Sequence, residues 1–340
     1  MATYLLIFAA ALFVTMVATP VARRIAMGLG ILDHPESRKL HKAPVPLLGG
    51  VAIYAAFVVA ILVFGDQLNL PQLFSILIGA TAVSAMGVWD DRRRVRPLVK
   101  LGGQVAAALF VAVTGTQVIL FNSPLIDYAI AVFWIVAITN ALNLLDNMDG
   151  LSGGVAAIAS AFFLVLALLH GQYLVATLSA ALLGACLGFL RYNFNPATIF
   201  MGDGGSLFLG FILAAVGIRL RFPDQLTAIS WMIPVFVLSV PLFDTTLIVV
   251  SRLRRGLNPL TTPGRDHLSH RLVAMGLSQT HAVLFIYVLC LFLGLLSIVI
   301  AFSTLLVAYA VAVVVGLVAV ASLIILERVG YRGRVSVPSP

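Results

Sequence analysis

Long apolar stretches separated by short polar segments make up most of the chain. A helix needs roughly 20 mainly apolar residues to cross the hydrocarbon core of a bilayer, and eleven runs come close to that length. They cover 3–22, 47–64, 72–89, 99–119, 126–145, 153–170, 172–190, 205–219, 228–250, 279–301 and 303–326. Some runs are short or closely spaced, so ten spans is the alternative. The pattern predicts an all-α polytopic membrane bundle.

The composition agrees with a membrane protein. Hydrophobic residues make up 61% of the chain and charged residues only 10%, whereas a soluble domain is normally about 25% charged. An ordinary cytosolic globular protein is therefore excluded. Cys186 and Cys290 both lie in apolar runs, so neither a disulfide framework nor a CxxC metal site is predicted.

The basic residues predict how the chain is oriented. The first run is not expected to be a cleavable signal peptide, because its leader is uncharged and Arg23 and Arg24 follow it. With the N-terminus outside, all but two of the 21 Lys and Arg residues fall on the inner side, the exceptions being Arg219 and Arg221. The net charge of +8 then suits the anionic inner leaflet, and no nucleic-acid partner is expected.

This topology predicts a single membrane domain over 1–328 with a cytoplasmic tail at 329–340. The cytoplasmic loops fall near 33–50, 90–100, 140–154, 191–206 and 251–272. Most acidic residues lie on this same side, whereas an ion-coupled transporter keeps its ionisable groups near the bilayer midplane. The distribution favours an enzyme that works at one membrane face.

Two loops carry acids and amides suited to a cation. Asp90 and Asp91 are adjacent at a span end, where two carboxylates are costly to ionise together. Three interpretations of this acidic pair stay open: a magnesium site, a general base with a raised pKa, or pairing with nearby arginines. Asn140, Asn143 and Asn147 share one helix face if the fifth span stays helical, and amide and carboxylate oxygens suit magnesium. We expect Gly150 to end that helix and to leave Asp149 at a bend.

Three further loops could bind anions. Arg38, His41 and Lys42 either line a phosphate path or touch lipid headgroups. The glycine-rich turn around Asp203 offers backbone N–H groups to an anion, unless Asp203 is only a helix N-cap. A helical turn would bring together His267, His270 and Arg271. Two histidines make a poor zinc site, so this turn is either a phosphosugar contact or a solvated amphipathic loop.

Acids, amides and cations at one membrane face are what phosphoryl transfer requires. The chain has no Walker loop, Rossmann fingerprint or soluble nucleotide domain. The residues themselves therefore indicate an integral membrane enzyme that handles phosphorylated substrates.

An ordered set of motifs makes this more specific. They are Asp90-Asp91 with Lys100, Asn140-x-x-Asn143-x-x-Asp146-x-x-Asp149-Gly150, Phe200-x-Gly202-Asp203-x-Gly205-Ser206 and His267-x-x-His270-Arg271. From about residue 33 to 272 the chain resembles the polyprenyl-phosphate N-acetylhexosamine-1-phosphate transferase family. Arg38-Lys39-x-His41 and the histidines resemble its UDP-N-acetylglucosamine branch, although that branch usually has two adjacent histidines where Ser269 precedes a single His270.

The resemblance implies a role for each matched residue. Magnesium, or alternatively manganese, would bind Asp203 with help from Asn143. The implied catalytic residues are Asp90, Asp91, Asp146 and Lys100. Phe200 would stack on uracil while Asp149 binds the edge of the base. Further substrate contacts are expected from Arg38, His41, Lys42, Asn140, His267, His270 and Arg271.

The implied reaction moves N-acetylglucosamine 1-phosphate from its UDP donor to undecaprenyl (polyprenyl) phosphate and releases UMP. This would start a cell-envelope glycan such as teichoic acid or lipopolysaccharide at the cytoplasmic face of the bacterial inner membrane. The acceptor phosphate carries about −1.5 to −2 charge, so direct attack is expected, with a covalent aspartyl intermediate as the alternative. A sister enzyme using another UDP-N-acetylhexosamine, the phospho-N-acetylmuramoyl-pentapeptide transferase, a transporter of a phosphorylated substrate, and a homodimeric state stay open.

Overall fold

The computed structural model describes residues 1–35, 43–65, 70–93, 95–121, 123–259, 261–262 and 264–328. Within these ranges the fold is helical, apart from a short antiparallel pair of strands, β1 (Leu32–Asp33) and β2 (Val45–Pro46). The helices are α1 (Ala2–Leu29), α2 (Gly49–Phe64), α3 (Leu70–Arg93), α4 (Pro97–Val113), α5 (Pro124–Leu145), α6 (Leu151–Leu169), α7 (Tyr173–Asn193), α8 (Asp203–Arg219), α9 (Thr227–Ser230), α10 (Met232–Val237), α11 (Ser239–Arg254), α12 (Leu268–Ala274), α13 (Gln279–Ala301) and α14 (Leu305–Arg328).

Each of the eleven apolar runs contains at least one helix, so the prediction of an all-α polytopic bundle is confirmed. By length and composition, seven helices could cross a membrane, or eight if the bent pair Thr227–Val237 and Ser239–Arg254 is one span. The full count of eleven spans is not reached. The reason is length, because α2, α4 and α8 have only 16, 17 and 17 residues, and a helix rises about 1.5 Å per residue.

Local sequence explains several helix ends. The helix α1 stops at Gly30, which adopts a left-handed φ of 67° and whose N–H bonds back to the last turn. Pro97 and Pro124 stand at the first positions of α4 and α5, where a missing N–H leaves no helical bond unmade. The ninth apolar run is broken rather than straight, with a 76° bend between α10 and α11.

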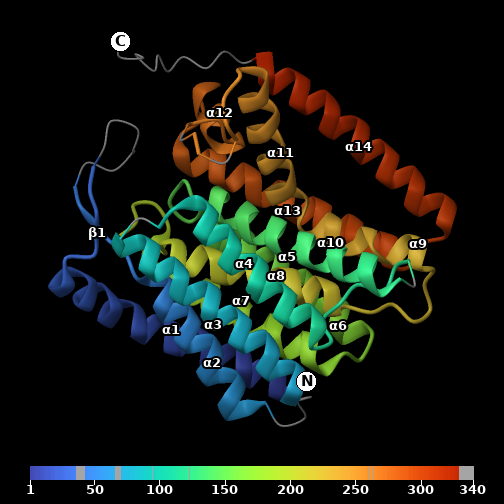
Figure 1. The fold of residues 1–340 in the computed structure, drawn as a ribbon, viewed down its shortest axis with the longest axis horizontal. Helices are drawn as coiled ribbons and strands as arrows, with labels where there is room; N and C mark the ends of the chain where they lie inside the picture. Colours follow the sequence, from blue (N-terminus) through green and yellow to red (C-terminus); the bar gives the residue numbers. More distant parts are fainter. Residues whose placement is uncertain are drawn as a thin grey trace.

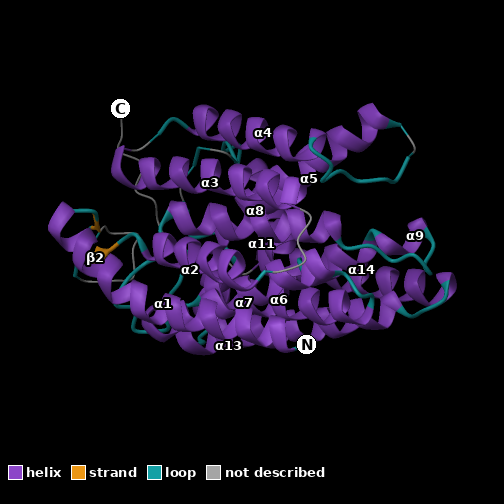
Figure 2. Ribbon diagram, turned by 90° about the horizontal axis from the view of Figure 1, so that it is seen from below, coloured by secondary structure: helices purple, strands orange, loops and turns teal. Residues whose placement is uncertain are grey.

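The helix α8 is the centre of the bundle, between α3 and α5 (Figures 1 and 2). All but its two terminal residues are buried, so its apolar sequence is covered by protein on every side. By contrast, α14 runs along the edge of the bundle and is almost entirely exposed. Most of its leucines and valines are exposed, which is the pattern of a lipid-facing helix.

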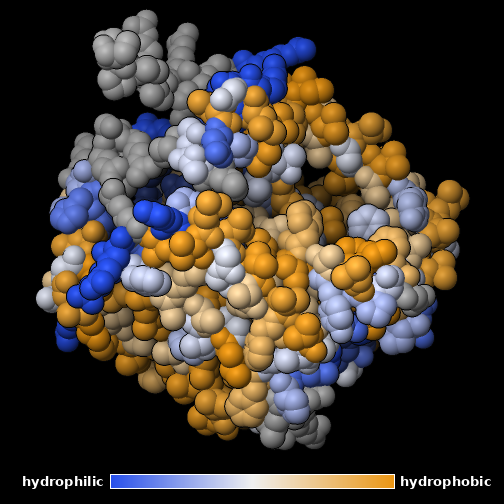
Figure 3. Space-filling view, in the orientation of Figure 1, coloured by the Kyte–Doolittle hydropathy of each residue, from blue (hydrophilic) through white to orange (hydrophobic). Residues whose placement is uncertain are grey.

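Polar and apolar surfaces are separated on the molecule. In Figure 3 hydrophobic residues cover the middle of the visible face, and hydrophilic ones gather near the end where Figure 1 shows β1 and α12. The short helix α9 lies at the opposite end (Figure 1). The polar loops that carry the predicted site residues therefore converge on one end of the helical bundle.

Candidate active site

The side chain of Lys100 joins residues from four helices. From the first turn of α4, its ammonium donates to Asp90 Oδ2 on α3 at 3.0 Å and to Asn143 Oδ1 on α5 at 3.4 Å. It also forms an ion pair with Asp203, the first residue of α8. Segments 103 residues apart in sequence thus supply one compact cluster of opposite charges.

Asn143 holds Asp203 from the other side. Its amide donates to Asp203 Oδ1 and to Ser206 Oγ, both at 2.9 Å. Each oxygen of Asp203 therefore has a partner, one on α4 and one on α5. This brings residues of the second, third and fourth polar loops together in one site, as their motifs predict.

Asp91 has a structural contact that the sequence did not reveal. Its carboxylate accepts hydrogen bonds from the backbone N–H groups of Asp203, at 2.9 Å, and Gly204, at 3.2 Å. A carboxylate at a helix N-terminus is favoured by the helix dipole. Gly202 has a φ of 72°, and a Cβ there would lie 2.5 Å from Asp91 Oδ2, so the turn needs glycine.

This geometry corrects three expectations about the second and fourth loops. The N-terminus of α8 is not an open anion site, because Asp91 already takes two of its N–H groups and Gly202 O accepts from Gly205 and Ser206. Asp203 is not the N-cap, a position that Gly202 occupies. Arginine pairing of the two acids is also wrong for the residues described, since Asp90 bonds Lys100 and the backbone N–H of Val95.

The first and fourth loops are joined through their backbones. Phe200 donates its N–H to Pro46 O at 2.8 Å and accepts from the N–H of Gly49 at 3.0 Å. Gly50 continues this pairing by donating to Met201 O at 2.9 Å. Phe200 is thus fixed beside the start of α2. The other predicted residues of the first loop, Arg38, His41 and Lys42, lie outside the described residues.

The third loop differs from its prediction at the helix boundary. The helix α5 ends at Leu145, and Gly150, with a φ of 77°, is the N-cap of α6 instead of the end of α5. Asn147 consequently lies beyond the helix, off the face shared by Asn140 and Asn143. A left-handed glycine is compatible with either helix end, which is why sequence alone misassigned it.

Asp146, which follows α5, is the electrostatically unusual residue of this loop. Its carboxylate makes no hydrogen bond or ion pair with any residue that the structure describes. Burial, with the nearby carboxylates of Asp203, Asp91 and Asp149, raises the pKa of Asp146 to about 8. A neutral or cation-bound carboxyl is therefore favoured at this position.

Two other third-loop residues bind protein groups. Asn140 pairs with the buried Gln104 of α4 and donates to Val136 O at 2.8 Å. Asp149 Oδ2 accepts from Asn195 Nδ2 and from the N–H of Ala197, both at 3.0 Å. Asp149 thereby holds the segment that leads to Phe200.

The fifth loop brings its two histidines together at α12. The rings of His267 and His270 lie 5.8 Å apart between centroids. Burial, followed by the nearby His267 and Arg265, lowers the pKa of His270 to about 4, so this ring is neutral at pH 7. Ser269 donates to Asn147 Oδ1 at 2.6 Å, which ties α12 to the third loop.

The side chain of Arg271 contacts α11 and α14 and makes no hydrogen bond or ion pair with the described residues Asp90, Asn143 and Asp203. Its guanidinium donates to Asp266 O, Leu326 O, Ser251 Oγ and Glu327 Oε1, at 2.5 to 2.9 Å. The neighbouring Asp266 is buried and accepts from Arg252 Nε at 3.0 Å and from Arg255 Nη2 at 2.7 Å. Ion pairs therefore hold this loop against the bundle.

The donor set fits a hard divalent cation that also binds phosphate. The described residues hold no ready-made group of three His, Cys, Asp or Glu side chains for a metal. Magnesium, however, typically takes only one or two protein carboxylates and completes its shell with substrate phosphates and water. The unpartnered, half-buried Asp146 beside Asp203 and Asn143 offers such oxygens.

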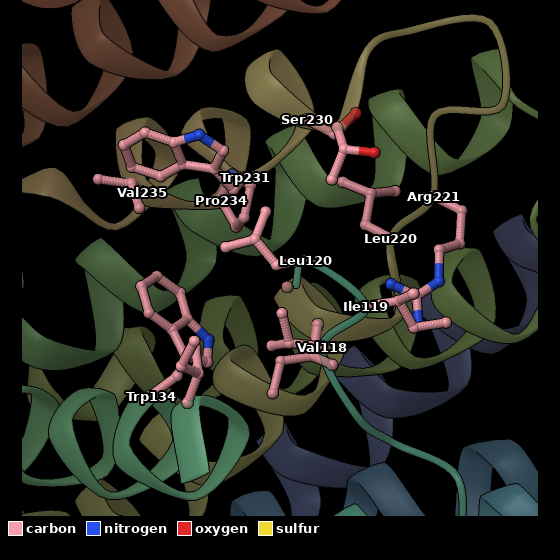
Figure 4. A pocket seen from close by; sticks show the side chains of 14 residues that line it. Val118, Ile119, Leu120, Trp134, Leu220, Arg221, Ser230, Trp231, Pro234 and Val235 are labelled. Atoms are coloured by element: carbon pink, nitrogen blue, oxygen red, sulfur yellow. The ribbon is translucent and has the colours of Figure 1, made fainter. Parts of the chain in front are cut away.

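A separate cavity of about 180 Å³ is lined mainly by apolar side chains from α5, α8, α9, α10 and the connecting segments 118–120 and 220–221. Figure 4 shows Trp134, Trp231 and Arg221 around it. None of the predicted site residues lines this cavity. The candidate chemistry therefore belongs to the charged cluster.

Four contributors to the site received no role from the motifs. Gln104 and Asp244 lie outside the motifs, whereas Ser206 and Ser269 lie within them without an assigned contact. Asp244 gave the clearest hint, as an acid inside an apolar run. A charge there must be paired to be tolerated, but its partner, His267, is 23 residues away.

Comparison with known proteins gives consistent results. Residues 73–221 match the model of Glycosyl transferase family 4. The chain is similar to a "Probable undecaprenyl-phosphate N-acetylglucosaminyl 1-phosphate transferase" of Bacillus subtilis (36% identity, 83% of this chain and 80% of that protein). It is also similar to a "Decaprenyl-phosphate N-acetylglucosaminephosphotransferase" of Mycolicibacterium smegmatis (34%, 82% and 77%). An "Undecaprenyl-phosphate alpha-N-acetylglucosaminyl 1-phosphate transferase" of Escherichia coli K12 matches at 28% identity, over 78% of this chain and 75% of that protein.

Proposed function

Because this chain belongs to glycosyl transferase family 4, we propose that it transfers N-acetylglucosamine 1-phosphate from UDP-N-acetylglucosamine to a polyprenyl phosphate, releasing UMP. The observation that carries the proposal is the convergence of Lys100, Asp90, Asn143 and Asp203 from four helices. Paired with the names of its relatives, this cluster supports a diphosphate site at the end of a membrane bundle.

The charges of the site suit a reaction between two anions. The acceptor phosphate carries about −1.5 to −2 charge, so it is a competent nucleophile and its repulsion from the diphosphate is the main barrier. We assign the Lys100 ammonium to the diphosphate. Magnesium held by Asp203 and Asn143, with Asp146 in support, would neutralise further phosphate charge.

We propose direct transfer. An oxygen of the lipid phosphate forms a bond to the sugar-linked phosphorus, and the bond from that phosphorus to the UMP oxygen breaks, with UMP taking the electron pair. Asp90 and Asp91 need not act as bases. Asp90 sets the charge around Lys100, and Asp91 holds the N-terminus of α8, and with it Asp203, in place.

The remaining family residues divide into substrate contacts and supports. We assign Phe200 to the uracil, with Asp149 fixing the segment before it and binding the base edge, and His267 and His270 to the sugar-phosphate. Arg271, whose donors already bind α11 and α14, is assigned to holding α12. The concentration of basic residues at this end supports a cytoplasmic site in a bacterial plasma membrane.

The test is turnover of purified protein in detergent, with undecaprenyl phosphate and UDP-N-acetylglucosamine, followed by mass spectrometry of the lipid. We expect equimolar UMP and lipid-diphospho-N-acetylglucosamine without a sealed vesicle. Product only from UDP-N-acetylmuramoyl-pentapeptide would select the sister branch. No product at all, together with vesicle-dependent uptake, would indicate a transporter. Exchange of UMP into UDP-N-acetylglucosamine without lipid would refute direct transfer.

A further inference from the structure

The carboxylate of Asp244 contacts the first residues of α12 with both of its oxygens. Asp244 is on α11 and is 0% exposed. Its Oδ2 lies 2.9 Å from Nδ1 of His267, and its Oδ1 accepts a hydrogen bond from the N–H of Leu268 at 2.6 Å. Capping of α12 explains the hydrogen bond from Leu268 N–H, but it does not explain the contact with Nδ1 of His267.

The contact with the ring determines which nitrogen of His267 carries a proton. An ionised carboxylate is only an acceptor, so Nδ1 carries a proton, and in the neutral ring the lone pair is then on Nε2. His267 is 6% exposed, and its Nε2 makes no hydrogen bond with any described residue. The partner of Nδ1 thus determines whether Nε2 of the neutral ring donates or accepts a hydrogen bond.

The orientation of α12 is fixed from a second direction. Ser269 donates to Asn147 Oδ1 at 2.6 Å, and Asn147 donates to Leu144 O at 3.0 Å. Asn147 adjoins Asp146, whose neighbours include Asp203 and Asp91. His267 is consequently held by its own contact to α11, and α12 is held by the contact of Ser269 to the third loop.

We propose that Asp244 is a positioning residue that locks His267 in the Nδ1–H tautomer, so that Nε2 accepts a hydrogen bond from an N–H or O–H group of the donor sugar. This rests on the proposed function, because it assumes a sugar nucleotide in the site. Asp244 itself contacts only protein groups. With Nε2 of His267 as a hydrogen-bond acceptor, the site would favour a sugar that has an N–H or O–H group facing this nitrogen over a sugar that lacks one.

Asp244→Asn provides a sharp test because asparagine has the same shape. Its oxygen can keep the bond from Leu268 N–H, and its amide then donates to Nδ1. This moves the ring proton to Nε2 and turns an acceptor into a donor. We expect the KM for UDP-N-acetylglucosamine to rise about tenfold, with the KM for polyprenyl phosphate unchanged. In a His267→Gln background the substitution should have no further effect.

The tautomer is measured directly by ¹⁵N NMR of histidine-labelled protein in micelles, with His267→Gln assigning the signal among six histidines. Wild type should show Nδ1–H at pH 8, and Asp244→Asn should show Nε2–H. Asp127→Asn is the matched control, because Asp127 is buried and accepts two backbone N–H groups far from this site. An Nε2–H signal in wild type, or an undiminished Asp244→Asn defect without His267, would overturn the proposal. Absence of wild-type turnover would defeat the proposed function alone, since the NMR result still tests the pair.

Discussion

Asp91→Asn tests whether this acid supports α8 or takes part in the chemistry. In the structure each carboxylate oxygen receives one backbone N–H, from Asp203 and from Gly204. Asparagine keeps one acceptor and turns its NH₂ toward the other donor. A hydrogen bond to a charged group is worth about 1.5–3 kcal/mol, and the lost interaction with the helix dipole about 0.3–1 kcal/mol. The expected destabilisation is therefore about 2–4 kcal/mol.

The assay combines thermal denaturation in detergent with UMP release. We expect Asp91→Asn to melt several degrees lower and to lose most of its turnover, because Asp203 moves when the N-terminus of α8 loses a hydrogen bond to the Asp91 carboxylate. Asp127→Asn is the control. Both N–H groups that Asp127 binds reach Oδ1, which asparagine retains, so it should melt closer to wild type and turn over normally. An Asp91→Asn variant with unchanged melting and no activity would refute the supporting role and favour direct action on the substrate.

Three further predictions concern other parts of the site. Lys100→Met should lower kcat by at least about 10²-fold, because removing one preorganised donor to the charge that develops in a transition state typically costs about 10²–10³ in kcat; near-normal kcat would exclude a role for the ammonium in transfer. His270, with its pKa lowered to about 4, makes the folded state lose stability as the pH falls from about 6.5 to 4, by up to about 3 kcal/mol. His270→Gln should therefore lessen acid sensitivity in denaturation experiments over that window, and identical pH profiles would contradict this. Gly202→Ala should destabilise the protein and impair turnover, since its φ and Asp91 leave no space for a methyl group; unimpaired turnover would show that the turn can move.

The helices, and the loops that come together at the site, could be predicted from the sequence. Apolar runs fall on helices because the backbone must satisfy its own hydrogen bonds in a bilayer. Lys100, Asn143 and Asp203 lie at the polar ends of helices. Charged and polar side chains are expected there, because burying them in the apolar part of the bundle would cost free energy. Fewer than eleven helices reach spanning length for a related reason, because a short helix such as α8 is covered by other helices and does not need the length of an isolated span.

The specific partners could not be read from the sequence. Asp91 and the N-terminus of α8 are 112 residues apart, and no local pattern distinguishes a capping carboxylate from a catalytic one. Arg271 follows His270 in a motif, yet on a short helix its side chain is directed toward α14. Pairing of this kind depends on how the helices pack, which the order of polar residues does not determine.

The central claim is that Asp203 and Asn143 form one cation and diphosphate site, and EPR of Mn²⁺ bound in place of Mg²⁺ tests it most directly. The account predicts one tightly bound Mn²⁺ per chain in the presence of UDP-N-acetylglucosamine, with ³¹P hyperfine coupling to the diphosphate. Asp203→Asn should weaken this binding at least tenfold, and Asp127→Asn should leave it unchanged. Full-strength Mn²⁺ binding with the same ³¹P coupling in Asp203→Asn would place the cation elsewhere and contradict the account.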